Sequence, residues 1–117
     1  MQVLKCDIHK TPFSDGSFDT IVDTFGLECC YDLDLAWAEM KRVTKPGGKI
    51  LLLERGKAIW LKDNFEIMRK ATLNLGARGQ VYHTDWEKLI EADPDVKVLK
   101  CKRKLQGMLY VYIIEKL

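Results

Sequence analysis

The pattern of apolar and polar positions divides the chain into short strands and amphipathic helices. Thr20–Thr24 is rich in β-branched residues and predicts a strand, and Ile50–Leu53 is an uninterrupted apolar run that predicts a second one. Between them, Leu33–Val43 has helical periodicity and the turn Lys45–Gly48 ends it. A strand, a helix and a strand in this order predict a parallel pair within an α/β sheet.

The predicted helix carries an N-cap and a single apolar stripe. Asp32 is the predicted capping residue, or Asp34 if the helix starts two residues later. Apolar residues recur at i, i+4 and i+7, namely Ala36, Met40 and Val43. The run Ile50–Leu53 shows no alternation, which is typical of a central strand that is covered on both faces.

The rest of the chain adds an N-terminal strand end, two helices and a pair of strands. The predicted segments are a strand end at Met1–Cys6, a loop at Asp7–Gly16, a helix at Lys62–Leu75, a short helix opened by Thr84 and Glu87, and strands at Val96–Lys102 and Met108–Glu115. The short connection at Gly107 predicts that the last two strands are antiparallel neighbours. We therefore predict one α/β domain over residues 1–117.

Composition limits the classes of function. The 117 residues are 47% hydrophobic and 31% charged, which is typical of a globular domain and not of a disordered chain. No apolar run reaches the roughly 20 residues that a membrane span needs. A net charge of +2 is too small to indicate a nucleic-acid partner. The sequence shows no evident targeting signal, so we expect a cytoplasmic protein. A mitochondrial location is the alternative if a missing N-terminal segment carried a targeting signal.

The four cysteines have no spacing typical of a metal site. They are Cys6, Cys29, Cys30 and Cys101, and none forms a Cys-x-x-Cys pair. Reduced thiols are the better interpretation, and we predict no metal. The lysines of Val96–Lys102 have two interpretations, a charged edge strand or a strip that binds phosphate or RNA. The strand lacks the interleaved aromatic residues of a nucleic-acid platform, which favours the edge strand.

Three stretches of the sequence resemble one enzyme family. Residues 7–19 (DIHKTPFSDGSFD), 24–27 (TFGL) and 39–54 (EMKRVTKPGGKILLLE) occur in order and at the expected spacing. Together they resemble class I S-adenosylmethionine-dependent methyltransferases, in particular type 11 and the ubiquinone/menaquinone C-methyltransferases. The resemblance implies a Rossmann-like sheet of order 3-2-1-4-5-7-6, mostly parallel with an antiparallel C-terminal strand pair. It also implies S-adenosylmethionine as the cofactor.

The resemblance implies four cofactor-binding residues. Asp7 matches the acid that accepts a hydrogen bond from the adenine amino group, and Ile8 matches the neighbour whose backbone N–H meets the adenine ring. Thr24 matches the small hydroxyl residue beside the methionine part of the cofactor, and Phe25 lies next to it. Each has a structural alternative: Asp7 caps a turn, Thr24 is a strand former and Phe25 belongs to the core.

The family's opening glycine-rich turn, of the D/E-x-G-x-G-x-G type, is not in this sequence, whose one Gly-Gly pair is Gly47–Gly48. We therefore expect the C-terminal half of the domain, with the N-terminal half of the fold missing, an open sheet edge at Thr20–Thr24, and poor binding of the cofactor by the isolated chain. One hypothesis is a methyltransferase whose N-terminal half is supplied elsewhere. The alternative is an inactive remnant that acts by pairing that edge with a partner chain or with itself.

Candidates for catalytic chemistry are few. A general base is needed only for some methyl acceptors, and the candidates are His9, His83 and Glu54. His9 is expected at the surface of the adenine-side loop, His83 in a loop on the substrate side, and Glu54 in a structural or substrate-facing position. We assign no catalytic residue. The "TFGL" stretch hints at a small lipophilic acceptor, which is otherwise unidentified.

Overall fold

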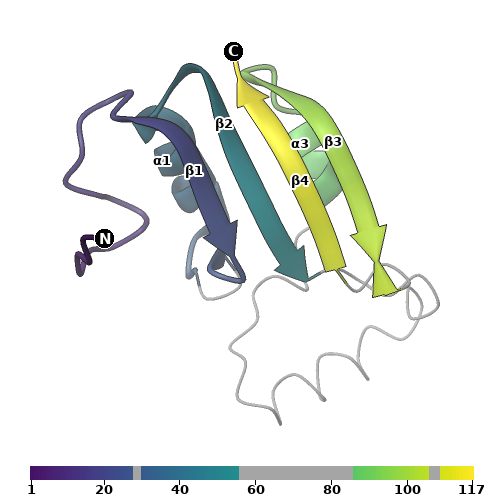
Figure 1. The fold of residues 1–117 in the computed structure, drawn as a ribbon, viewed down its shortest axis with the longest axis horizontal. Coiled ribbons are helices and arrows are strands. Elements are labelled where there is room, and N and C mark those ends of the chain that lie inside the picture. The colour runs from purple at the N-terminus through teal and green to yellow at the C-terminus, as the bar shows by residue number, and fades with distance from the viewer. Residues whose placement is uncertain (28–29, 56–85, 106–108) are drawn as a thin grey trace, which may run out of the picture.

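The computed structural model describes residues 1–27, 30–55, 86–105 and 109–117. They form a four-stranded sheet with two helices on one face (Figure 1). The elements are β1 (Phe18–Thr24), α1 (Leu33–Val43), β2 (Thr44–Arg55), α3 (Trp86–Glu91), β3 (Val96–Lys104) and β4 (Leu109–Lys116). The predicted helix at Lys62–Leu75, the loop with His83, Thr84 and the turn at Gly107 lie outside the described residues.

The sheet has the order β1-β2-β4-β3. β1 and β2 are parallel, whereas β4 is antiparallel to both β2 and β3. The predicted parallel pair and the predicted antiparallel C-terminal pair are both confirmed, and so is the α/β class. In the described residues the sheet is mixed, with one parallel and two antiparallel pairings.

The bounds of α1 agree with the sequence pattern. The helix runs from Leu33 to Val43, and the Asp32 carboxylate accepts a hydrogen bond from the backbone N–H of Leu35 at 3.0 Å. Such a cap satisfies an N–H group that has no partner within the helix. The apolar stripe of α1 packs on the sheet, where Ala36 and Met40 join Ile50 and Leu52 of β2 in the core.

Among the described residues, this core lies on one face of the sheet. Ile50 and Leu52 of β2 and Ile114 of β4 are at most 2% exposed, whereas Leu51 and Leu53 are half-buried. α1 and α3 both lie behind the sheet in Figure 1. The expected cover on both faces of β2 is therefore found on one face only, among the described residues.

The predicted strand end at Met1–Cys6 and the predicted start of β2 were wrong. Met1–Cys6 is not a strand, because no described strand lies beside it to pair with its backbone, and Val3 and Leu4 are exposed. β2 begins at Thr44 and not after Gly48, because Thr44 already pairs with Phe18. Four residues, 45–48, then bulge before Lys49 pairs with Thr20, and Gly47 takes a φ of +78° there.

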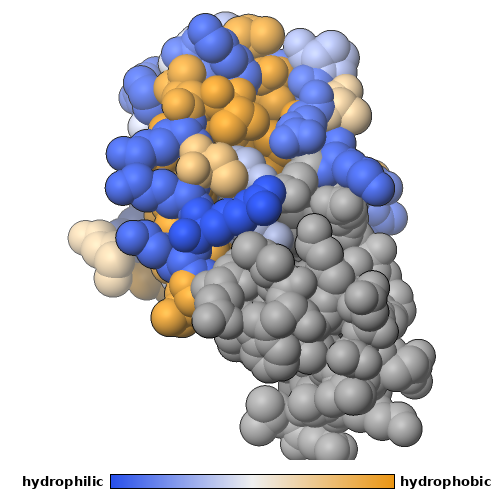
Figure 2. Space-filling model, turned by 90° about the vertical axis from the view of Figure 1, so that its right-hand side faces the viewer, coloured by the Kyte–Doolittle hydropathy of each residue, from blue (hydrophilic) through white to orange (hydrophobic). Residues whose placement is uncertain are grey.

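β3 is a charged edge strand. Its register shifts between Val98 and Lys100, and every residue from Leu99 onward is exposed. Arg103 lies over the ring of Tyr110 on β4 at 5.6 Å. Figure 2 views the molecule from the side of β3. In the coloured part of that view, hydrophilic residues surround the apolar ones. No helix among the described residues is long and apolar enough to cross a membrane.

Candidate functional site

Two loops meet beside the N-terminus of α1. One follows residues 1–6 and holds Asp7 and His9, and the other follows β1 and reaches Tyr31 and Asp32. The His9 and Tyr31 rings stack with their centroids 3.7 Å apart. The backbone N–H of Asp32 donates to Nε2 of His9 at 3.2 Å. The second loop lies at the carboxyl end of β1, where ligands bind in parallel α/β sheets.

Asp7 caps the turn of the first loop and keeps one oxygen outward. Its Oδ1 accepts hydrogen bonds from the backbone N–H of His9 at 2.9 Å and from Nδ1 of the same residue at 2.6 Å. The Tyr31 hydroxyl lies 3.4 Å from Oδ2. The backbone N–H and then the ring of His9 hold the pKa of the Asp7 carboxyl below its ordinary value. The turn-capping alternative is thus observed, and the side chain is still 53% exposed.

Ile8, Thr24 and Phe25 occupy the same part of the fold. Ile8 is half-buried and packs against the core. Thr24 is the exposed last residue of β1. Phe25 has a φ of +55°, which is rare for an aromatic residue, and its N–H donates to the Leu53 carbonyl at 2.9 Å. Backbone strain of this kind clusters at functional sites and turns.

The bend after Phe25 depends on a glycine. A Cβ on Gly26 would overlap the carboxylate of Asp23, whose Oδ2 accepts a hydrogen bond from the backbone N–H of Leu27 at 3.1 Å. Leu27 is buried in the core. The chain therefore turns sharply at the end of β1, and Thr24 and Phe25 are held at the rim.

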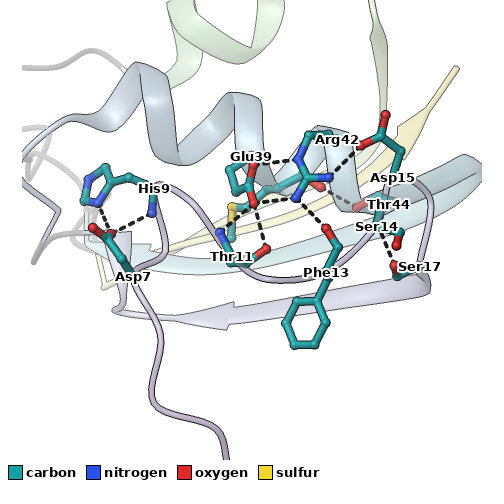
Figure 3. A network of polar contacts seen from close by, with 11 residues as sticks. Asp7, His9, Thr11, Phe13, Ser14, Asp15, Ser17, Glu39, Arg42 and Thr44 are labelled. Atoms are coloured by element: carbon teal, nitrogen blue, oxygen red, sulfur yellow. Dashed lines mark hydrogen bonds and ion pairs between the residues drawn. The ribbon is translucent and has the colours of Figure 1, made fainter.

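An ion pair on α1 anchors the loop that leads into β1 (Figure 3). Oε1 of Glu39 accepts hydrogen bonds from the backbone N–H and the hydroxyl of Thr11, both at 2.7 Å. Arg42 donates from Nε to Glu39 at 2.8 Å, from Nη2 to the Phe13 carbonyl at 2.7 Å and from Nη1 to Asp15 at 2.5 Å. The Arg42 and Thr11 hydrogen bonds lower the pKa of Glu39 to about 2.

An open apolar groove of about 290 Å³ runs between this loop and β1. Its lining comes from the loop, β1 and α1: Ile8, Thr11, Phe13, Phe18, Thr20, Ile21, Val22, Asp23, Glu39, Met40 and Val43. The groove and the roles of Glu39 and Arg42 were not predicted. The E-x-x-R spacing on α1 was the available signal, but its partners lie 27 to 29 residues away in the chain.

The structure supports no catalytic role for the remaining candidate residues that it describes. The side chain of His9 is 6% exposed, so the expectation of a surface residue was wrong; the Tyr31 stack and the Asp32 contact bury it. Glu54 is 2% exposed on the core face of β2, which fits the structural interpretation. Cys30 is buried, and His83 and Cys29 lie outside the described residues. No cluster of three potential metal ligands occurs in the part of the chain that the structure describes.

The chain is similar in sequence to known methyltransferases. Residues 1–52 match the family described as a methyltransferase domain. The ubiquinone/menaquinone biosynthesis C-methyltransferase UbiE of Burkholderia cenocepacia is 49% identical over 66 residues, which is 55% of this chain and 27% of that protein. The enzyme of the same name from Paraburkholderia phytofirmans is 36% identical over 111 residues, 90% of this chain and 45% of its own length.

A solved structure shares the fold over nearly the whole chain. The S-adenosylmethionine-dependent methyltransferase from Thermotoga maritima, described as a possible histamine N-methyltransferase, aligns with a TM-score of 0.71 and 19% identity. The alignment covers 99% of this chain and 64% of that one. In the two sequence comparisons above, by contrast, the chain spans less than half the length of each curated C-methyltransferase.

Proposed function

We propose that this chain is part of a class I S-adenosylmethionine-dependent methyltransferase and takes part in methyl transfer from S-adenosylmethionine. Support comes from the methyltransferase-domain match of residues 1–52 and from the 36% identity with a C-methyltransferase over 111 residues. It supplies the adenine side and the methionine side of the cofactor pocket. The observation that carries this proposal is the meeting of the Asp7 loop with the loop after β1, where His9 stacks on Tyr31.

The residues at this rim suit the cofactor. The half-exposed carboxylate of Asp7 accepts the adenine amino group through Oδ2, and the backbone N–H of Ile8 faces the adenine ring. The exposed Thr24 and the adjoining Phe25 lie toward the methionine part. S-adenosylmethionine supplies a sulfonium methyl group that is displaced in line. The protein's contribution is then to position the reactants and to exclude water.

The acceptor in this proposal is a small lipophilic molecule. Its support is the name of the relatives, which are C-methyltransferases of ubiquinone and menaquinone biosynthesis. The proposal includes no nucleic-acid partner and no segment that spans a membrane. Cys6, Cys30 and Cys101 form no disulfide among the described residues, which fits a reducing compartment such as the cytoplasm. The alternative of an inactive remnant gains no support from the enzyme names of the relatives.

The free edge of β1 is the second part of the proposal. We propose that it pairs with a strand of a segment that carries the glycine-rich turn, and that this pairing completes the cofactor pocket. The apolar groove beside β1 supports this partner, as does the exposure of Val22, which is 67%. The complementing segment for experiments is taken from the part of the Paraburkholderia phytofirmans relative that lies outside its match with this chain, since the match covers 45% of that protein.

Calorimetry with S-adenosylhomocysteine tests both parts. The 117-residue chain alone should bind negligibly at micromolar concentration, and its mixture with the complementing segment should bind and transfer methyl groups. Asp7→Asn should weaken binding in the mixture about tenfold, as loss of a hydrogen bond to a charged group does. Asp34→Asn, on the exposed side of α1, is the matched control and should change nothing.

Two outcomes contradict the proposal at different points. Micromolar binding by the chain alone would refute the need for the complementing segment. An assembled mixture that binds no S-adenosylhomocysteine would refute the cofactor site itself.

A further inference from the structure

The buried ring of His9 is held by three neighbours. Its side chain is 6% exposed, although it belongs to a short loop at the surface. Nδ1 lies 2.6 Å from Oδ1 of Asp7, Nε2 lies 3.2 Å from the backbone nitrogen of Asp32, and the ring plane stacks on Tyr31 at an interplanar angle of 24°. Both ring nitrogens and one ring face are therefore engaged.

These contacts define the protonation of the ring. A backbone N–H only donates, so Nε2 of His9 must accept the hydrogen bond from Asp32. An imidazole that accepts at Nε2 carries its proton at Nδ1 when neutral, and Nδ1 then donates to Asp7. With both nitrogens occupied in this way, the ring has no lone pair left to act as the general base that the sequence raised as one candidate role.

The same contacts make the two oxygens of Asp7 unequal. Oδ1 accepts from the backbone N–H of His9 at 2.9 Å and from its ring at 2.6 Å. Among the residues that the structure describes, Oδ2 contacts only the Tyr31 hydroxyl, at 3.4 Å, the outer limit of a hydrogen bond. A carboxylate oxygen accepts about two hydrogen bonds, so Oδ1 is filled and Oδ2 has room for a further donor.

We propose that His9 is the positioning residue of the adenine subsite: its neutral Nδ1–H ring fixes the rotation of the Asp7 carboxylate and directs Oδ2 toward the exocyclic amino group. This inference rests on the proposed role of Asp7. The ring also links the Asp7 loop to the N-cap of α1 through Asp32, so the subsite is tied to a rigid element. His9 acts on the ligand only through Asp7.

The test compares two nucleosides that differ only in the amino group. Adenosine carries it and purine riboside lacks it. Each is titrated to millimolar concentration into the ¹⁵N-labelled 117-residue chain mixed with the unlabelled complementing segment, and the amide signals of Asp7, Ile8 and Tyr31 are followed. The wild-type chain should prefer adenosine roughly tenfold, the difference that a hydrogen bond to a carboxylate makes.

Three variants separate positioning from a structural role. His9→Ala should bring the preference close to one. His9→Asn should keep most of it, because its side-chain amide donates from nearly the position of Nδ1. Tyr31→Phe keeps the ring, and the preference should stay within about twofold. Unchanged amide signals for β2 and β4 verify that each variant is folded, and ¹⁵N shifts of the wild-type ring should identify the Nδ1–H tautomer.

The outcomes divide cleanly. If His9→Ala weakens both nucleosides equally and leaves the preference intact, or if the ring is the Nε2–H tautomer, His9 is not the positioning residue while the role of Asp7 stands. If the assembled wild-type mixture shows no preference for adenosine, or no binding, the role of Asp7 fails and the positioning role of His9 fails with it.

Discussion

The two edge strands of the sheet are built differently. β3 carries lysines at 100, 102 and 104, and the register shift before Lys100 bends it away from regular pairing. Charged side chains and bulges are the usual means by which proteins keep an edge from pairing with another chain. β1 spans only seven residues, FDTIVDT, and contains no lysine.

The two acids of β1 do not protect its edge in the same way. Asp19 pairs with Lys45 at 2.9 Å, and Asp23 turns into the next loop to accept the Leu27 N–H. Val22 remains 67% exposed beside the apolar groove. β3 therefore carries features that keep an edge strand from pairing with another chain. β1 lacks these lysines and exposes an apolar residue, as a strand that pairs on both sides would. Variants on the two sides of the sheet can test that contrast, beginning with the largest expected effect.

Removing the anchor on the β1 side should have the largest effect. Glu39→Ala leaves Arg42 without its main partner and frees the loop at Thr11. Loss of a carboxylate that takes part in several charge-assisted hydrogen bonds costs about 3 kcal/mol. The free energy of unfolding from urea titration measures it. Lys102→Ala on β3 is the control and should stay within about 0.5 kcal/mol. A loss below about 1 kcal/mol for Glu39→Ala would contradict the anchor.

Acid should weaken the β1 side through the same residue. The pKa of Glu39 is lowered from 4.5 to about 2 in the folded chain, so its contribution is fully present above about pH 5. It is lost as the pH falls toward 2, because the unfolded chain then binds the proton more readily than the folded one. We expect on the order of 2 kcal/mol from urea titrations at pH 6 and pH 2.5.

Glu39→Gln supplies the control for acid. The amide that replaces the carboxylate does not titrate, so the variant should be less stable at pH 6 but lose less of its stability between the two values of pH. An equal loss in the wild-type chain and in the variant would assign the acid sensitivity to other carboxylates.

A charge on each edge strand should distinguish the two edges in assembly. Val22→Lys places an ammonium group where the complementing segment is proposed to pair, and it should weaken association about tenfold, or about 1.4 kcal/mol. Leu99→Lys puts the same group on β3, where the residue is 44% exposed, and should have no effect. Sedimentation with the labelled complementing segment measures both. If both variants weaken association equally, the complementing segment does not pair specifically with β1.

Removing lysines from β3 should have the smallest effect. The double variant Lys100→Thr/Lys102→Thr removes two charges from a strand whose residues are exposed there. We expect a measurable increase in self-association of the chain, worth a few tenths of a kcal/mol per residue. Concentration-dependent sedimentation detects it. No change would indicate that the bulge alone protects this edge.

Local patterns predicted the regular elements well. α1 was predicted from Leu33 to Val43 because its apolar positions and the Asp32 cap lie within one short stretch. The pairing of β3 with β4 followed from a short connection between two strand-like runs. These signals involve residues that are close in the chain, so a single sequence contains them.

Contacts between distant residues were not predictable in the same way. His9 is buried by Tyr31 and Asp32, more than 20 positions along the chain. Thr11 meets Glu39 across 28 positions. Whether Thr44 belongs to a strand depends on its partner Phe18, and the failure of Met1–Cys6 to form a strand depends on what lies beside it. The candidate site consists mainly of such contacts, which is why its geometry and the roles of Glu39 and Arg42 were not predicted.

Amide hydrogen exchange tests the contrast between the edges most directly. The exchange of β1 and β3 amides is compared in the chain alone and with the complementing segment present. We predict that the β1 amides that do not bond to β2 become at least about tenfold slower, while those of β3 keep their rates. Slower exchange at β3, or no change at β1 in a mixture that has assembled, would contradict the claim that β1 is the edge at which the cofactor site is completed.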